Sequence, residues 1–493
     1  MEPRRASALA RLRLWERGAL IALALLFIAF GVLVEIRSVF LTRRMGDFGC
    51  YARGAWAVRT GADLYDVTCD NDWHYNYPPL LAILMAPLAD PRHGADAAGM
   101  TPYAVSVALW YLFSLACLFL AVHALARALE QRSPDPGVRD QPAGCRRWWA
   151  LRLYPVLICV APVGQTLMRG QVNTLVLALL CGILASMIRG ANFRAGLCLA
   201  GAACIKVYPI FLCVYPLWTR NRRCLAGCLA GLFIGLIVVP VAAFGPAQTV
   251  AVYEKYVTVL LGPALTGDGD DTRTEELLSV NATWSQAFEV VIHKTMYRDR
   301  LTRPLEIPRW LKLAHLAVGA GLTLLVLLVA RRAAHRATGV VFTFGSLFLL
   351  MILLCPICHL HYFTFCVPLL MALLAQRWEG KSTLGSGTGL TVLFALFFVA
   401  NGLPQFDELA VLRDVGTAMY SGLLLMAAAL LQAWRAAVAA PAIVGKDSAR
   451  LTGIGSVLHL ASPPKVRRFA PANIKPTDPA GFPTECHQCH PWA

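Results

Sequence analysis

Long apolar runs, separated by short polar connections, occupy most of the chain. A helix needs about 20 apolar residues to cross a membrane, so runs of about 18 or more mark transmembrane helices rather than core helices. Such runs predict full crossings near residues 18–40, 102–128, 150–168, 171–188, 224–243, 311–330, 338–355, 361–376, 388–403 and 411–434. We therefore predict an all-α polytopic membrane protein with about ten full transmembrane helices.

Two further apolar runs do not fit a single crossing. "YPPLLAILMAPLA" (77–89) is too short to cross. Residues 195–218 lie between Arg194 and Arg220, so a single crossing would leave one basic end outside. A break at "KVYP" (206–209), whose proline cannot donate a backbone hydrogen bond, returns both ends to the cytoplasm. Broken helices at membrane depth line cavities, so we predict one or two re-entrant elements and a site at the break.

The positions of Arg and Lys orient the chain. The formal charge of +16 gathers in short connections, as the positive-inside rule predicts for cytoplasmic loops, which argues against nucleic-acid binding. This orientation predicts a cytoplasmic N-terminus (1–17), a transmembrane domain (18–437) with exterior loops 41–101 and 244–310, and a disordered cytoplasmic tail (438–493). The first apolar run is too long for a signal-peptide core and is expected to be retained. We expect a multi-pass protein among the lipids of a bacterial inner membrane.

Composition supports the membrane class. Hydrophobic residues make up 57% of the chain and charged residues 15%, whereas soluble domains carry about 25% charged residues. Most of the sixteen cysteines lie in apolar runs, where they act as small hydrophobes, but Cys50 and Cys69 share an exterior loop and are candidates for a disulfide. "CHQCH" (486–490) matches the c-type haem attachment pattern. Haem attachment occurs outside the cytoplasm, so chance is favoured here over a haem or a weak metal site.

Two ionisable residues are the strongest candidates for chemistry. Asp47 follows the first apolar run by a few residues. It is either a solvated loop acid or a general base that takes a proton from a hydroxyl group. Lys206 lies within an apolar run, where an ionisable residue is a functional candidate by default. It either reaches the membrane surface through its long side chain or binds a phosphate or a substrate carboxylate.

Two polar motifs stand at the ends of predicted spans. "RGQVNTLVLALL" (169–180) begins a helix with polar residues that either cap the helix or bind a ligand. "CPICHLHYF" (355–363) holds two histidines that are either interfacial or ligand-binding, and no third metal ligand stands at a convincing spacing. The predicted orientation brings these groups to one water-facing chamber: Asp47, Gln171, Asn173, Lys206, His359 and His361.

The motifs, taken in order, resemble a known family. An Asp-Phe pair followed by Tyr precedes "YPPLLAILMAPL", "GQVNTLVLAL", "AACIKVYPIFLCVYPLWTRNRR" and a late His-Tyr pair. This order is similar to that of glycosyltransferase family 87 of the GT-C superfold, which includes mycobacterial polyprenol-phosphate-mannose-dependent mannosyltransferases. The resemblance covers roughly residues 20–435. It departs at Cys355-Pro356, where the family usually has Ser-Pro.

The resemblance implies roles for individual residues. Asp47 matches the acid that activates the acceptor hydroxyl, and Lys206 and His361 match residues suited to the donor phosphate. Arg169 is a further candidate for that phosphate. Other residues expected to contact substrate are Tyr51, Tyr77, Gln171, Asn173, Tyr208, His359 and Tyr362. Because Asp47 is followed by Phe48 rather than by a second acid, we expect no metal, and we expect no cofactor.

The expected function is therefore an integral-membrane glycosyltransferase. It would move a sugar, mannose or a similar hexose, from a polyprenyl-phosphate donor to a hydroxyl of a lipid or glycan acceptor by inverting displacement. The site would face the periplasm or exterior. The alternative is a secondary transporter or lipid flippase, because broken helices and an intramembrane lysine also mark transport sites.

Overall fold

The computed structural model describes residues 12–41, 46–92, 95, 97–263, 276, 285–299, 301–333, 336–380 and 387–438. The predicted disordered tail beyond residue 438 and its "CHQCH" pattern lie outside the described residues, as does most of the predicted cytoplasmic N-terminus. Within the described ranges the secondary structure is helical, with two isolated β-bridges, Thr68 with His74 and Ser285 with His359.

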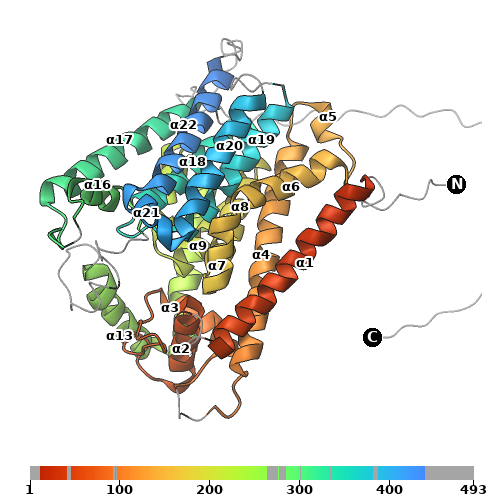
Figure 1. The fold of residues 1–493 in the computed structure, drawn as a ribbon. Coiled ribbons are helices and arrows are strands. Elements are labelled where there is room, and N and C mark those ends of the chain that lie inside the picture. The colour runs from red at the N-terminus through yellow and green to blue at the C-terminus, as the bar shows by residue number, and fades with distance from the viewer. Residues whose placement is uncertain are drawn as a thin grey trace, which may run out of the picture. The chain divides into compact units, whose positions relative to one another are not determined.

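Seven helices in the described part of the chain are long and apolar enough to cross a membrane. They are α1 (Leu14–Ile36) with a following π-helical turn (Arg37–Leu41), α4 (Tyr103–Gln131), α11 (Arg222–Phe233) continuing into α12 (Val239–Phe244), α17 (Arg309–Ala333), α19 (Val367–Trp378) with the preceding 3-10 helix (Leu360–Cys366), α20 (Gly387–Gly402) and α22 (Thr417–Val438). They coincide with seven of the ten predicted crossings, and Figure 1 shows how they lie beside one another.

The other three predicted crossings are a bent pair and two shorter helices. Helices α8 (Asn173–Ile188) and α18 (Ala337–Leu353) are the short ones. The run at 150–168, predicted as one crossing, is instead bent by 70° between α6 (Arg146–Ile158) and α7 (Val160–Arg169). Pro162 in the first turn of α7 explains the bend, because its nitrogen cannot continue the hydrogen-bond ladder of α6.

The predicted break near residue 206 is present. Helix α9 (Asn192–Ile205) ends directly before Lys206, whose backbone is extended with φ −135° and ψ 130°. A 3-10 helix (Tyr208–Cys213) and the short α10 (Val214–Trp218) follow. The chain therefore has no regular helix where it presents Lys206.

Short helices gather at one end of the bundle. Helix α2 (Gly46–Thr60) packs against α3 (Pro79–Leu84), which is too short to cross a membrane, as predicted for its segment. Helix α13 (Pro246–Tyr256) is drawn at the same end of the bundle (Figure 1). The remaining short helices are α5 (Pro136–Arg139), α16 (Phe288–Met296) and α21 (Val411–Val415).

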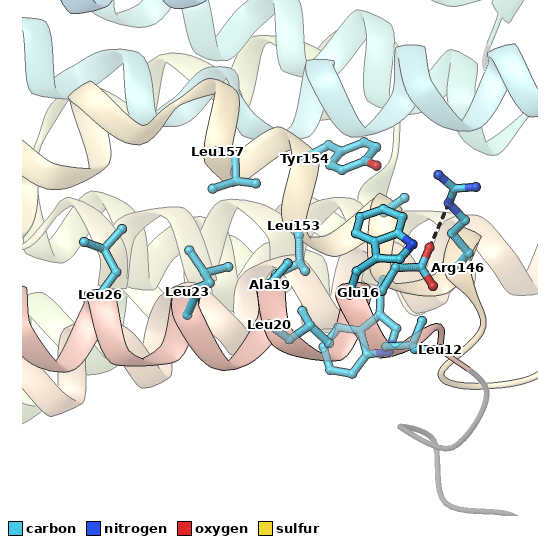
Figure 2. Close-up of a pocket in the computed structure, with 14 residues that line it drawn as sticks. Leu12, Glu16, Ala19, Leu20, Leu23, Leu26, Arg146, Leu153, Tyr154 and Leu157 are labelled. Carbon is cyan, nitrogen blue, oxygen red and sulfur yellow. Dashed lines mark ion pairs between the residues drawn. The ribbon is translucent and has the colours of Figure 1, made fainter.

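Helix α1 is the least buried of the long helices and leaves an apolar groove beside α6. The groove has a volume of about 550 Å³. Figure 2 shows leucines of both helices lining it and the ion pair of Arg146 Nε with the Glu16 carboxylate, 3.1 Å, near one end. It contains none of the predicted site residues, and its apolar walls are suited to lipid chains rather than to a polar substrate.

Close contact between α9 and α11 holds the helix that leads to Lys206. A Cβ atom added to Gly196 would lie 2.0 Å from the carbonyl oxygen of Cys224, and one added to Gly227 would lie 2.1 Å from that of Phe193. Small residues at such a crossing let two backbones approach closely, which is a common way to pack helices in membranes. The N-terminal part of α9 is thus fixed by backbone-to-backbone packing, and Lys206 follows the other end of the same helix.

This packing gives a stability prediction. Gly196→Ala should lower the thermal unfolding temperature in detergent, because the new methyl group meets backbone and overpacking costs about 1–3 kcal/mol or more. The matched control is Gly201→Ala on the same helix, where the added Cβ would make an ordinary contact of 3.5 Å with Leu179. Equal unfolding temperatures for the two variants would contradict the close α9–α11 contact.

Candidate active site

One cavity collects most of the predicted site residues. Its volume is about 310 Å³, at the lower end of the range for small-molecule sites. The polar and aromatic residues that line it come from seven separate segments: Asp47, Cys50, Trp73, His74, Asn76, Tyr77, Arg169, Gln171, Lys206, Tyr208, Tyr256, Glu276, His359 and Tyr362. Residues up to 315 positions apart in the sequence therefore share one chamber, as the predicted orientation requires.

Asp47 and Arg169 form an ion pair in the wall of this cavity. Asp47 lies in the first turn of α2, where the helix dipole favours an acid. Arg169 is the last residue of α7, and the left-handed Gly170 (φ 66°) turns the chain directly after it. Arg169 Nε donates to Asp47 Oδ2 at 2.7 Å. The Arg169 side chain is 43% exposed and that of Asp47 15%, so solutes in the cavity can reach the pair.

Lys206 is a buried cation with amide oxygens as its partners. Its side chain donates to Asn173 Oδ1 at 2.8 Å and to Gln171 Oε1 at 3.3 Å, and the residue is only 4% exposed. Among the described residues, no carboxylate lies within ion-pair distance of Lys206 Nζ. A buried charge is costly unless it is paired. The arrangement thus offers a desolvated positive charge to an anion in the cavity.

Three tyrosine rings surround this ammonium group. The ring centres of Tyr77, Tyr208 and Tyr362 lie 5.5, 5.4 and 4.5 Å from Lys206 Nζ, within range of cation–π attraction. Burial raises the pKa of Tyr77 far above its usual value, so this hydroxyl stays neutral. The rings hold the lysine without neutralising its charge.

The tyrosines of the first loop are linked to the same network. Tyr51 lies behind the cavity wall, where its hydroxyl donates to Gln171 Oε1 at 3.1 Å and lies within hydrogen-bond distance, 3.0 Å, of Tyr77 Oη. Trp110 of α4 donates its indole N–H to the carbonyl of Gly170 at 2.7 Å. These contacts fix the turn that carries both Arg169 and Gln171.

The two histidines take different positions. His359 lines the cavity, and burial, followed by the nearby Arg169 charge, lowers the pKa of His359 to about 4, so the ring is neutral at neutral pH. His361 lies behind it, with its ring stacked 5.2 Å from that of His359 and only 1% of the residue exposed. The Nε2 atom of His361 has no hydrogen-bond partner within the described residues. His361 thus supports the wall but does not line the cavity.

Two residues that sequence reasoning missed hold the histidine loop. Gln286 N donates to Cys358 O at 2.6 Å, and Cys358 N donates to Ser285 Oγ at 3.3 Å. The Gln286 side chain also donates to the carbonyl of Arg413 at 2.8 Å. Ser285 and Gln286 belong to a polar connection without periodic pattern, so no sequence signal marked them.

A second acid, Glu276, was also missed and lines the cavity. Its carboxylate contacts His74 Nδ1 at 2.8 Å and accepts from Asn76 Nδ2 at 3.0 Å. Glu276 is one of four acids in "DDTRTEELL" (270–278), so the sequence did not single it out. Within the described residues, no three His, Cys, Asp or Glu side chains gather closely enough to hold a metal ion.

Two comparisons of this sequence with known proteins point to the same class of protein. The sequence model of glycosyltransferase family 87 matches residues 75–356, more than half of the chain. A polyprenol-phosphate-mannose-dependent alpha-(1-2)-phosphatidylinositol pentamannoside mannosyltransferase of Mycolicibacterium smegmatis is 27% identical over 379 residues, which cover 74% of this chain and 78% of that protein.

The family match includes the segments that carry Tyr77, Arg169 and Lys206, whereas Asp47 and His359 lie outside it. The geometry alone places those two with the rest. The helices form an all-α membrane fold of the GT-C type, and the family model matches the segments that carry most of the cavity lining. This chain belongs to glycosyltransferase family 87.

Proposed function

We propose that the cavity binds a polyprenyl-phosphate-linked sugar, mannose or a similar hexose, and transfers the sugar to a hydroxyl group of a lipid or glycan. The observation that carries this proposal is the buried ammonium group of Lys206, which has amide oxygens and ring faces around it. The mannosyltransferase relative, whose name states a polyprenol-phosphate-mannose donor, supports the same donor class.

The donor phosphate would lie between Lys206 and Arg169, which line the same cavity. Charge-assisted hydrogen bonds from both cations would stabilise the negative charge that grows on the departing phosphate. The prenyl chain would leave over the apolar part of the wall, formed by Val207, Leu260 and Leu261. Val207 is 39% exposed, as expected for a residue that faces lipid.

Arg169 would connect the donor to the base. Its Nε atom holds Asp47, while a guanidinium group carries four further N–H donors on its two terminal nitrogens. These terminal donors can bind the phosphate without breaking the contact to Asp47. One side chain would thus place the leaving group and the base at a fixed separation.

The proposed reaction is a single displacement. The acceptor oxygen attacks the anomeric carbon of the sugar, Asp47 takes the proton of that hydroxyl, and the bond from the anomeric carbon to the phosphate oxygen breaks. The polyprenyl phosphate leaves with the electron pair, and a single displacement inverts the configuration. A positioned base of this kind contributes about 10²–10⁴-fold to the rate.

The site would face the periplasm or exterior of a bacterial inner membrane. Helix α6 begins at Arg146, α9 carries Arg194 in its first turn and α11 begins at Arg222, so each of these helices has a basic residue at its start. The segments that begin with α6 and α9 reach the cavity at Arg169 and Lys206. The positive-inside rule then places the cavity on the opposite side. On this proposal residues 18–437 form the transmembrane catalytic domain, with exterior loops at 41–101 and 244–310.

Asp47→Asn should lower turnover by about 10²–10⁴-fold while donor binding persists, because the amide cannot accept the hydroxyl proton. The measurement is transfer from polyprenyl-phosphate mannose to a lipid acceptor by purified protein, together with donor affinity. Asp63→Asn is the control, since Asp63 pairs with Lys255 away from the cavity. Normal turnover in Asp47→Asn would remove this residue from the mechanism.

Lys206→Met should weaken donor binding by about tenfold to a hundredfold, since a hydrogen bond to a charged group contributes about 1.5–3 kcal/mol. Methionine keeps the length of the side chain and removes the charge. Lys255→Met is the matched control, because Lys255 pairs with exposed acids. Equal donor affinity in both variants, measured by titration with polyprenyl-phosphate mannose, would refute the phosphate site at Lys206.

Arg169→Lys tests the connecting role of the guanidinium group. Lysine keeps the charge but cannot hold Asp47 and a phosphate through separate nitrogens. We expect the turnover number to fall more than the donor affinity. A variant with wild-type turnover would show that charge alone suffices at this position.

A further inference from the structure

Two cysteines next to the candidate active site lie in direct contact. The Sγ atoms of Cys50 and Cys69 are 2.8 Å apart, and the residues are 7% and 5% exposed. Another close pair in the described part of the chain, Cys213 with Cys228, has its sulfur atoms 3.7 Å apart and belongs to the membrane helices. The first pair instead joins α2 to the loop that follows it.

The backbone around both cysteines is held from several sides. Cys69 N donates to Trp73 O at 2.8 Å, within a tight turn that the bridge between Thr68 and His74 closes. Arg53, one turn beyond Cys50 on α2, donates to Thr68 O at 3.0 Å and to Asp70 Oδ1 at 2.7 Å. Arg53 thus binds the residues on both sides of Cys69, so the contact of the two sulfur atoms is built into the packing.

We propose that Cys50 and Cys69 form a disulfide bond that joins the helix of Asp47 to the segment that leads to His74 and Tyr77 in the cavity lining. Both S–H bonds break, one S–S bond forms, and two electrons and two protons pass to a disulfide of an exterior thiol oxidase, which is reduced to two thiols. The exchange proceeds by attack of a thiolate on that disulfide. It takes place during folding, before the loop covers both sulfur atoms.

The electrostatics of the pair suit this reaction. The hydrogen bond from Cys50 lowers the pKa of Cys69 to about 7, so Cys69 is partly a thiolate at neutral pH. A thiolate rather than a thiol is the nucleophile in disulfide exchange. One of the two sulfur atoms attacks the disulfide of the oxidase, and the other resolves the mixed disulfide.

The bond would act on the site through its position. Cys50 lies one helical turn after Asp47, and both line the cavity. Cys69 leads into the segment that carries His74 and Tyr77, which line it from another side. A covalent link between these two segments would hold the base at a constant distance from the tyrosine next to Lys206.

Peptide mass mapping of the full-length protein tests the bond. Cells are lysed directly in a denaturant that contains N-ethylmaleimide, so that buried thiols are alkylated too, and the protein is purified and digested without reductant. We expect a linked Cys50–Cys69 peptide, with Cys213 and Cys228 alkylated as internal controls. Alkylation of both Cys50 and Cys69 in the unreduced protein would overturn the proposal.

The disulfide proposal rests on the proposed exterior position of loop 41–101. A second experiment therefore distinguishes a failure of that orientation from a failure of the disulfide itself. If the cysteines are alkylated in the first experiment, protein purified without N-ethylmaleimide is oxidised with diamide. Rapid linkage there would trace the failure to a reducing compartment, which contradicts the proposed orientation. Absence of linkage would instead trace it to the geometry of the pair. Transfer of the sugar from the donor is measured separately whether or not the cysteines become linked, so that the proposed function is tested apart from the disulfide.

Serine variants provide an independent readout. Cys50→Ser, Cys69→Ser and the double variant should lose the same amount of thermal stability and activity, because either change removes the same bond. Cys213→Ser should show neither loss. Losses that add up in the double variant would show that each sulfur acts on its own and would overturn the disulfide.

Discussion

The site depends on keeping one ammonium group, that of Lys206, buried at the wall of a cavity. In a regular helix the backbone groups bond to one another and the side chains project on all sides. Helix α9 instead ends at Ile205 and leaves Lys206 in an extended backbone conformation. The amides of Gln171 and Asn173 solvate the charge. The glycine contact with α11 fixes the N-terminal part of α9, the helix that leads to Lys206. The arrangement is suited to receive an anionic group.

The acid and the cations act together in this geometry. Asp47 is tied to Arg169, and Arg169 stands on a turn that Trp110 holds from α4. Tyr51 joins the helix of Asp47 to Gln171, which in turn contacts Lys206. The proposed base and the proposed phosphate-binding groups are therefore coupled through these hydrogen bonds and the short backbone turn between Arg169 and Gln171. A catalyst of group transfer needs its base and its leaving-group site at a fixed separation.

The sequence was informative where a single local pattern decides the structure. Apolar runs located the seven helices that are long enough to cross a membrane in the described part of the chain, and the basic ends of residues 195–218 predicted the break that presents Lys206. The sequence was less informative where distant segments meet. The ion pair of Asp47 with Arg169, the place of His361 behind His359, and the hold of Gln286 on the histidine loop all depend on tertiary contacts. The 70° bend after α6 was missed because its prolines lie within an otherwise continuous apolar run.

The central claim is that Lys206 receives the phosphate of a lipid-linked sugar. The most direct measurement is a structure of the protein with a non-transferable polyprenyl-phosphate sugar bound. The account predicts a phosphate oxygen about 2.7–3.2 Å from Lys206 Nζ, within the cavity that Asp47 lines. A phosphate bound elsewhere, with Lys206 still in contact only with Gln171 and Asn173, would contradict it.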